Sequence, residues 1–443
     1  MKKKCTLALA ALLVVSSFPL SSCGKSSDNV LRVASWDEYI DEGDSEAGTR
    51  ALYEEFEDWY EQEYGKEIKV EYVALQDNET MYNKIKMGDK YDLLCPSEYM
   101  MMKMLAEGRL EKYPESFFLT DDPNYPHNYY AKNVSPYIKG VFDKGANGNS
   151  WTEYIAGYMW GTTGFIYNPE EFSSPDIFKS WTAFTNKECK RNITAKDNVR
   201  DSYFAALGLY YEQELLALKA AYERGDITLE AYQSELSRMM NDTSAETIKD
   251  IQNKRVLKNL RENLYGLETD EGKMDIVMGR FGASYQWSGD AVYVRDVAEE
   301  QDDPLYLEYS IPEAASNIWF DGWVMMKGAN VEAATAFVNF LSIPENAKRN
   351  MEYIGYTSCI GGDLIFDYVK DLYEADETET DVVPYDLSYF FGENHIFNVP
   401  AANQRRQVFV QYPDFETTKR LVVMNYFDKA TNEKLNRMWI TIK

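Results

Sequence analysis

Three short segments of the sequence place an aromatic ring within three residues of a carboxylate. They contain Trp36 and Tyr39 around two acids in "SWDEY", Trp287 and Asp290 in "QWSGD", and Trp319 and Asp321 in "WFD". A carboxylate pairs with an ammonium group, and the face of a Trp or Tyr ring attracts a cation by roughly 0.5–2 kcal/mol, depending on desolvation. One such pair alone is equally compatible with core packing. Their recurrence in one acidic chain predicts a site for a cation that also carries hydrocarbon.

The sequence lacks the motifs of the common catalytic and metal-binding sites. Its two histidines, His127 and His395, stand in no HExxH pattern and in no cluster with carboxylates at metal-ligand spacing. GxSxG, GxGxxG and P-loop patterns are also absent, so nucleophilic hydrolysis, dinucleotide binding and phosphate binding have no support. We therefore predict no catalytic residue, no metal and no cofactor. A secreted glycan hydrolase built on two carboxylates remains the alternative from another class, since such a pair leaves no readable motif.

The net charge indicates which classes of partner the protein can bind. With 73 acidic and 46 basic residues, the chain carries a charge of −27. This charge repels nucleic acid and an anionic membrane surface, and it attracts small cations over a distance. Nucleic acid is therefore excluded as a partner, whereas a small cationic solute fits the charge.

Alternating strands and helices position the first aromatic and acidic segment. These elements are expected at 31–34, 52–64, 67–75, 78–88 and 91–95. The order strand, helix, strand, helix, strand predicts a parallel sheet covered by helices, with ligands outside the carboxyl ends of the strands. Trp36 and Tyr39 follow the first strand, and Ser97 and Tyr99 follow the third. We expect both loops to open on one edge of the sheet.

The length and the middle of the sequence indicate two lobes with an added helical face. A chain of 443 residues exceeds the roughly 250–300 residues at which a single core stops growing. Asp197 and Asp201 are spaced i, i+4, and Asp197 or Asn198 is expected to cap the helix that follows. Residues 212–266 form a charged insertion with three expected helices, the third preceded by a capping box that begins at Thr243.

The N-terminus has the layout of a bacterial lipoprotein signal. Three lysines precede the apolar run "TLALAALLVVSSFPL", which is too short to span a membrane as a mature helix. Small residues then lead to Cys23, as in a lipobox whose cysteine becomes the lipidated first residue once 1–22 are removed. Residues 23–29 follow as a polar tether. The pattern predicts an extracytoplasmic protein that is anchored to the membrane through Cys23.

Segments spread over most of the chain after the signal resemble, in order and approximate spacing, the extracytoplasmic spermidine/putrescine-binding proteins of polyamine ABC importers. They are "SWDEY", "ETMYNKIKMGDKYDLLCPSEYMMMKM", "YMWGTTGFIYN", "VRDSYFAALG", "QWSGDA" and "IWFDGWVMMKGANVEAATAFVNFLSIPENAKRNMEYIGY". The resemblance implies an α/β, periplasmic-binding-protein-like fold with a hinged cleft between two lobes. One lobe would comprise 30–161 plus 320–366, and the other 162–319 plus 367–443. The insertion 212–266 and a longer C-terminal tail depart from the simplest members.

The resemblance also implies which residues line the cleft. They are Trp36, Tyr39, Ser97, Tyr99, Asp201, Trp287, Asp290, Trp319, Asp321 and Tyr356. A second family acid falls at Asn198, which leaves Asp197 as a candidate substitute. A glutamine that contacts ligand in some relatives aligns with Met424, so no contact is assigned there.

As a function, the resemblance implies a receptor that captures polyamine outside the cytoplasm and delivers it to the membrane permease of an ABC transporter. No reaction and no cofactor are expected, and the receptor is expected to be a monomer. Carboxylates for the ammonium groups and aromatic faces for the hydrocarbon between them agree with this ligand. A receptor for another cationic or sugar-like solute is the alternative. Spermidine and putrescine are not separated, because the choice depends on cleft length and on which acids converge.

Overall fold

The structure is a computed structural model, and it describes residues 29–441 apart from 45–47, 122–126, 146–149 and 269. The predicted signal peptide, the predicted lipidation site Cys23 and most of the tether lie outside these residues. Among the helices that are described, none has the length and hydrophobicity that a bilayer crossing requires.

The N-terminal strands and helices form where the sequence predicts them. They are β1 (Val30–Trp36), α1 (Leu52–Tyr64), β2 (Lys69–Leu75), α2 (Asn78–Met87) and β3 (Leu93–Leu94). β1 pairs in parallel with β2 and with β3, as predicted. Gly65 and Gly88 end the two helices in the left-handed conformation that glycine adopts without strain. Trp36 is the last residue of β1 rather than part of a loop, so the sheet fixes its position.

One sheet of 12 strands runs through both halves of the molecule, with its main path in the order β2-β1-β3-β10-β5-β8-β6-β7. Its second parallel part consists of β6 (Ile193–Lys196), β7 (Gly266–Glu268) and β8 (Ala283–Trp287). Four short strands pair with the central strands β5 and β10, namely β4 (Leu110–Glu111), β9 (Glu308–Ser310), β11 (Thr357–Ser358) and β14 (Leu421–Val422).

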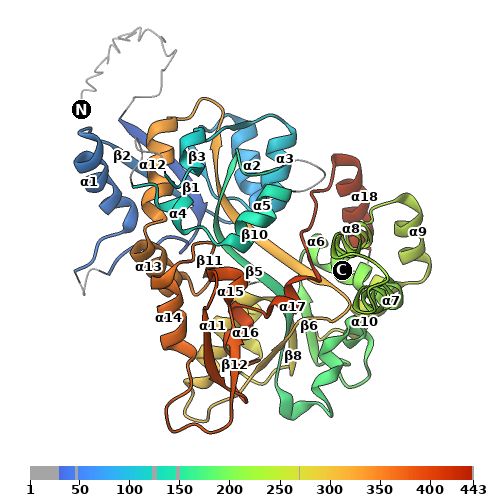
Figure 1. Cartoon of the computed structure of the whole chain (residues 1–443). Coiled ribbons are helices and arrows are strands. Elements are labelled where there is room, and N and C mark those ends of the chain that lie inside the picture. Colours follow the sequence, from blue (N-terminus) through green and yellow to red (C-terminus); the bar gives the residue numbers. More distant parts are fainter. Residues whose placement is uncertain (1–28, 45–47, 122–126, 146–149, 269, 442–443) are drawn as a thin grey trace, which may run out of the picture.

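Two long antiparallel strands, β5 (Ile155–Tyr167) and β10 (Ser316–Met326), join the two parallel parts of the sheet. All 13 residues of β5 are buried. The first half of β5 pairs with β10, and its residues from Thr163 onward pair with β8. One continuous strand therefore belongs to both halves of the molecule (Figure 1). The chain crosses between the halves within regular, hydrogen-bonded structure.

The buried apolar residues gather in two large clusters and one smaller cluster. The first cluster includes β1, β2, β3 and the first half of β5, with α3 (Glu98–Ala106), α4 (Tyr129–Asn133), α5 (Pro136–Lys144), α12 (Val331–Leu341), α13 (Pro344–Ile354), α14 (Asp363–Tyr373) and α15 (Ser388–Phe391). The second includes β6 and β8, with α6 (Val199–Tyr210) and α18 (Lys429–Ile440). The third lies around α11 (Ser288–Glu299) and α16 (Val408–Gln411).

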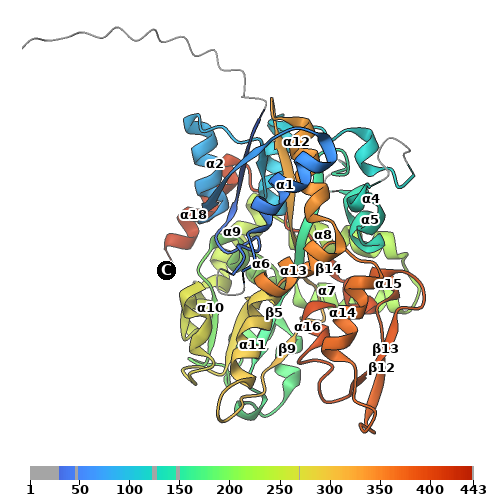
Figure 2. The ribbon, with the colours of Figure 1, turned by 90° about the vertical axis from the view of Figure 1, so that its left-hand side faces the viewer.

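The C-terminal part of the chain contributes to more than one cluster. Buried apolar residues from Val369 to Val399 belong to the first cluster, Phe409 and Val410 to the third, and Leu435 and Trp439 to the second. A separate antiparallel pair, β12 (Val382–Asp386) and β13 (Ile396–Pro400), lies beside α14, and the short helix α17 (Phe415–Thr418) precedes β14. Figure 2 shows α10 and α18 on the opposite side of the molecule from α14 and this pair. The lobe boundaries given above remain a prediction.

The insertion is helical as predicted, but it contains four helices rather than three. They are α7 (Glu212–Glu223), α8 (Leu229–Met240), α9 (Ala245–Asn253) and α10 (Val256–Asn263). The third expected helix is divided at Arg255, whose left-handed backbone (φ 57°) interrupts the helical path. The expected cap is also one residue off, because the side chain of Ser244, not Thr243, accepts the hydrogen bond from the Thr247 N–H at 3.2 Å.

Candidate functional site

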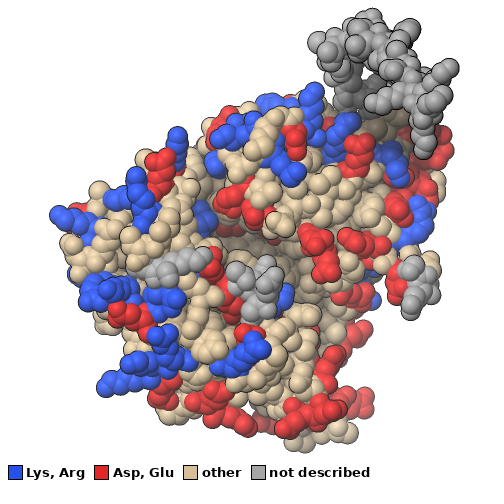
Figure 3. All heavy atoms as spheres, turned by 180° about the vertical axis from the view of Figure 1, so that it is seen from behind, with Lys and Arg blue, Asp and Glu red and all other residues tan. Residues whose placement is uncertain are grey.

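Strand ends and one strand face bring predicted site residues together. Trp36 ends β1, and Trp287 ends β8. Trp319 and Asp321 are two residues apart on β10, so they lie on the same face of that strand. A backbone bridge joins Ser97, at the start of α3, to Asp321. The space-filling view shows a hollow between the two halves of the molecule, with acidic side chains at its margin (Figure 3).

Asp321 is a buried carboxylate whose hydrogen-bond donor is an uncharged hydroxyl. Its side chain is only 6% exposed, and its Oδ2 accepts a hydrogen bond of 2.6 Å from the Tyr39 hydroxyl. Burial raises the pKa of Asp321 above the ordinary aspartate value, although the hydrogen bond from Tyr39 and the nearby polar groups of Ser97 and Trp36 favour the ionised form. The other oxygen, Oδ1, has no hydrogen-bond partner within the described residues. A cation placed there would gain a partner that the protein itself does not supply.

Glu98 is a second buried acid in this region, and the sequence analysis did not identify it. Its side chain is 4% exposed, and its Oε2 accepts a hydrogen bond of 3.3 Å from the Phe320 N–H. Burial raises the pKa of Glu98 to about 8, with the charge of Arg200 lowering it and that of Asp321 raising it further. Glu98 therefore holds a proton for much of its time at neutral pH.

Asp290 is as deeply buried as Asp321, but the chain's own cations surround it. Lys196 Nζ lies 2.8 Å from its Oδ2, and Lys273 Nζ lies 3.5 Å from its Oδ1. The Tyr356 hydroxyl donates a hydrogen bond of 3.2 Å to Oδ1. Burial alone would raise the pKa of Asp290, but the two lysines outweigh it, and the pKa is lowered. Asp290 is therefore ionised and already compensated.

Lys196 lies at the centre of this arrangement, at the carboxyl end of β6. Its side chain is buried, and its Nζ lies 4.3 Å from the centre of the Trp287 ring and 3.9 Å from Glu268 Oε1. Glu268 in turn accepts hydrogen bonds from three side chains, those of Thr194, Ser284 and Gln286. The ammonium group of Lys196 thus rests on a carboxylate and an aromatic face, the two surfaces predicted for a ligand cation.

Aromatic rings connect the Asp321 end of the site to the Asp290 end. Tyr39 and Tyr356 pack edge to face with their ring centres 6.0 Å apart, and Trp319 packs against Tyr356 at 5.4 Å. Tyr39 donates a hydrogen bond to Asp321, and Tyr356 donates one to Asp290. This aromatic wall of Tyr39, Tyr356 and Trp319 therefore connects the two carboxylates. Gly289 allows the close packing, since a Cβ at that position would lie 2.1 Å from the Tyr356 ring.

Tyr99 and Asp201 lie beside Arg200 on α6. The guanidinium carbon of Arg200 is 3.8 Å from the centre of the Tyr99 ring, and its Nη2 donates a 2.6 Å hydrogen bond to the Asn425 carbonyl. Burial raises the pKa of Asp201, while Asn198 and other neighbours, Arg200, Lys196 and Trp287, favour its ionised form. The cap of α6 is Asn198, whose Oδ1 accepts from the Asp201 N–H at 2.8 Å. Of the two caps considered, Asp197 is therefore the incorrect one.

Hydrogen bonds, ring contacts and electrostatic interactions link the ten predicted residues, with Lys196 and Arg200 taking part in these links. In the described part of the chain, no group of three or more His, Cys, Asp or Glu side chains is placed to hold a metal ion. Buried carboxylates beside aromatic faces are suited to binding a desolvated organic cation. Whether each of the ten contacts a ligand remains a prediction.

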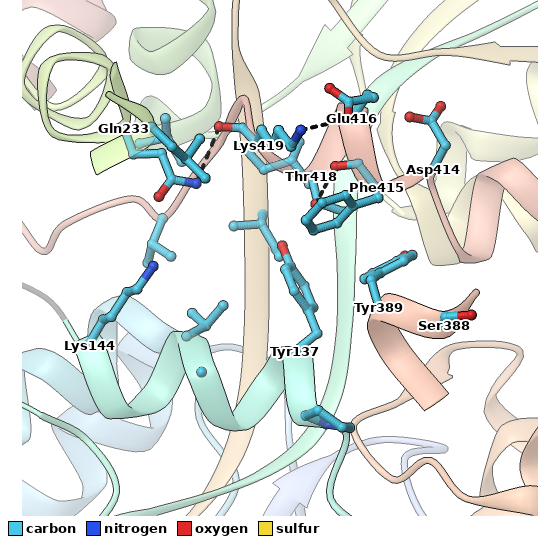
Figure 4. Close-up of a pocket in the computed structure, with 18 of the residues that line it drawn as sticks. Tyr137, Lys144, Gln233, Ser388, Tyr389, Asp414, Phe415, Glu416, Thr418 and Lys419 are labelled. Atoms are coloured by element: carbon cyan, nitrogen blue, oxygen red, sulfur yellow. Dashed lines mark hydrogen bonds and ion pairs between the residues drawn. The ribbon is translucent and has the colours of Figure 1, made fainter. Parts of the chain in front are cut away.

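A separate cavity lies on the opposite side of the crossing strands. It measures about 1110 Å³, and Ile318 of β10 lines it. Because side chains alternate along a strand, Ile318 faces away from Trp319 and Asp321. Figure 4 shows Tyr137 and Lys144 of α5 on one side of this cavity, with Gln233, Thr418, Lys419 and other residues facing them. Its lining mixes lysines with the acids Asp414 and Glu416, so it does not favour a cation as the first site does.

Comparisons with known proteins identify the chain's relatives. A family model described as bacterial extracellular solute-binding protein matches residues 51–361. The spermidine/putrescine-binding periplasmic protein of Salmonella typhimurium is 26% identical over 344 residues, which are 76% of this chain and 79% of that protein. The putrescine-binding periplasmic protein SpuD of Pseudomonas aeruginosa is 26% identical over 352 residues, which are 78% of this chain and 82% of that protein.

Solved structures agree with the fold. The spermidine/putrescine ABC transporter substrate-binding protein PotD of Streptococcus pneumoniae is similar with a TM-score of 0.61 at 24% identity, covering 94% of this chain and 98% of that chain. This likeness confirms the predicted two-lobed α/β fold.

Proposed function

The chain belongs to the bacterial extracellular solute-binding proteins, and from this premise we propose that it captures a polyamine outside the cytoplasm and delivers it to the permease of an ABC importer. Relatives named for binding spermidine and putrescine match about three quarters of the chain, which supports a polyamine as the ligand. The family consists of solute receptors rather than enzymes, as predicted, so the glycan hydrolase is set aside.

Asp321 is the observation that carries this proposal. It is a buried carboxylate whose Oδ1 has no hydrogen-bond partner among the described residues, and it stands beside Tyr39 and the aromatic wall that continues to Trp319. A desolvated ammonium group on that oxygen forms a charge-assisted hydrogen bond, while the rings contact the methylene chain. A sugar hydroxyl would also be able to donate a hydrogen bond to Oδ1, but it would not neutralise the charge of the carboxylate.

The ten residues named above would form the ligand cleft, and the predicted lobes would close on the ligand. One lobe is 30–161 plus 320–366 and the other is 162–319 plus 367–443, with β5 and β10 as the connection between them. Closure removes water from the carboxylates, and this strengthens each charge contact.

Thermal unfolding of the protein without residues 1–23 tests the ligand class. A ligand that binds only the folded form at 100 times its Kd stabilises it by about 2.7 kcal/mol, so putrescine or spermidine should raise the melting temperature clearly. Neutral mono- and disaccharides at the same concentration should leave it unchanged. No shift with millimolar amine would reject the polyamine receptor, and a shift with sugar alone would establish the sugar-like alternative.

Membrane attachment is a separate part of the proposal, and it rests on the pattern that ends at Cys23. Lipid on this cysteine would hold the receptor at the membrane while the tether 23–29 leaves the lobes free to bind. Cys23→Ala should abolish metabolic lipid labelling and membrane retention without changing amine binding by the soluble protein. Labelling that persists in the variant would refute the assignment.

A further inference from the structure

We infer that the ammonium group of Lys196 takes the place of a ligand ammonium group in the subsite formed by Asp290 and Trp287. The receptor therefore selects amines that carry one ammonium group fewer than a cleft with the same carboxylates and rings, but without Lys196, would bind. This inference rests on the proposed function and makes it more specific. It assigns Lys196 as a residue that determines specificity, and it assigns the Asp321 end as the place where an external ammonium binds.

The contacts of Lys196 are those of a bound amine. Its Nζ is 2.8 Å from Asp290 Oδ2 and 4.3 Å from the centre of the Trp287 ring, and 2% of the residue is exposed. A carboxylate for the charge, a ring face beneath it and exclusion of water are what a polyamine site offers to each ammonium group. The chain itself therefore satisfies at Asp290 the recognition that a ligand would otherwise satisfy.

An external ammonium would meet a positive environment at Asp290. Both carboxylate oxygens have a lysine near them, Lys196 on Oδ2 and Lys273 on Oδ1. A third cation would add two repulsive interactions for one attraction, in a setting where burial strengthens all of them. At Asp321, by contrast, the hydrogen-bond donor is the uncharged hydroxyl of Tyr39, and Oδ1 has no partner in the described part of the chain.

The position of Lys196 is set by the sheet and not by a mobile loop. It ends β6, which pairs with β7 and β8, and Glu268 of β7 lies 3.9 Å from its ammonium group. Displacing Lys196 would move a charged group away from Asp290 within the buried interior, and separating a buried ion pair is costly. A ligand ammonium group therefore does not replace Lys196 at equilibrium.

A second predicted cation-binding ring, like that of Trp287, already has a cation of the chain against it. Tyr99, one of the predicted cleft residues, has Arg200 at 3.8 Å from its ring centre. The guanidinium is held by the Asn425 carbonyl and also lies 4.8 Å from the Phe427 ring. Two of the predicted cation-binding rings thus carry a cation of the chain, which further reduces the charge that a ligand can bring.

Lys196→Met tests the inference with an amine series of increasing charge: n-butylamine, putrescine and spermidine. Calorimetry gives the gain in affinity for each added ammonium group. In the variant, Asp290 becomes available, and the gain from one further ammonium group should exceed the wild-type gain by about tenfold. Lys219→Met is the matched control, because Lys219 of the helical insertion pairs with Glu223 and Glu313 away from the site, and the gains of this variant should equal those of the wild type.

Equal gains in Lys196→Met and wild type would overturn the inference while leaving the polyamine receptor intact. Failure of every amine to bind either protein would instead reject the proposed function. If Lys196→Met does not fold, Lys196→Gln takes its place, because its neutral amide can still donate a hydrogen bond to the buried Asp290. It should show the same larger gain in affinity for each added ammonium group, and a gain equal to that of the wild type would overturn the inference.

Discussion

Asp321 and Asp290 are two carboxylates of the same site, buried to 6% and 3% exposure, yet their pKa values move in opposite directions. Burial raises both, but only Asp290 has lysines close enough to reverse the effect. At Asp321, burial outweighs the hydrogen bond from Tyr39, so the carboxylate is costly to ionise unless a cation binds to it. The comparison teaches that two equally buried acids are not equivalent partners for a cation, because lysines of the chain already neutralise one of them.

Removal of one carboxylate at a time should reveal the largest difference between Asp290 and Asp321, and this difference is in the free energy of unfolding. Asp290→Asn leaves the buried Lys196 without its nearest counter-ion, which should lower the free energy of unfolding by about 3 kcal/mol at pH 7. Asp321→Asn removes a charge that is disfavoured by burial, and we expect less than about 1 kcal/mol of destabilisation or a slight gain. Urea unfolding without ligand measures both. Equal losses in the two variants would contradict the comparison.

The acid dependence of these variants sharpens the same contrast. The lowered pKa of Asp290 means that its ionised form contributes stability above the unfolded value of about 4, and this contribution is lost as the pH falls through the folded value. The raised pKa of Asp321 has the opposite sign, so its cost at neutral pH disappears as the pH falls through its folded value. The deficit of Asp290→Asn relative to wild type should therefore shrink at acid pH, and a constant deficit would be inconsistent with this assignment.

Ligand affinity should depend on Asp321 more than on any general acidity of the chain. We expect Asp321→Asn to weaken putrescine or spermidine binding by more than about tenfold, because a buried charge pair is lost. Asp376→Asn is the control, since that acid is exposed in an acidic segment and should change the affinity by less than about twofold. Calorimetric titration of both variants decides the matter. Similar losses at both positions would mean that bulk charge attracts the amine.

A smaller effect is expected from Glu98, which should make the ligand affinity depend on pH. Its pKa of about 8 means that it is mostly protonated at pH 7 in the free protein, whereas a bound cation favours its ionised form. Binding should then release close to one proton at pH 7, and affinity should fall by about fivefold from pH 8 to pH 7. Glu98→Gln should remove most of this dependence. Titrations in two buffers of different ionisation enthalpy measure the proton count, and no release in the wild type would exclude Glu98 from the site.

The local signals of the sequence predict the framework of this molecule well. Period-two and period-3.6 patterns place β1, α1, β2 and α2, and the glycines at 65 and 88 end the helices as expected. The aromatic and acidic pairs lead to residues that do lie together. These features depend on neighbours in the sequence, which is why they can be read from it.

Charge pairing across the sheet could not be predicted in the same way. Lys196 ends an ordinary short strand, and only the alignment of β6 with β8, and of β8 with α11, brings it to Asp290, 94 residues away. Glu98 stands beside the predicted Tyr99, but nothing local shows that its carboxylate is buried. The position of Lys196 at the carboxyl end of a strand in a parallel sheet is the one local feature that could have drawn attention to it, because ligands gather at such ends.

The alternation of side chains along β10 has a practical consequence. Trp319 and Asp321 lie on the face that we propose binds the solute, while Ile318 faces a cavity that Lys144 and Lys419 also line. Ligand binding and a reporter group that detects it can therefore be placed on opposite faces of one strand. A dye attached near either lysine would lie beside the strands that join the two halves and on the face opposite the proposed site, an arrangement suited to an optical sensor.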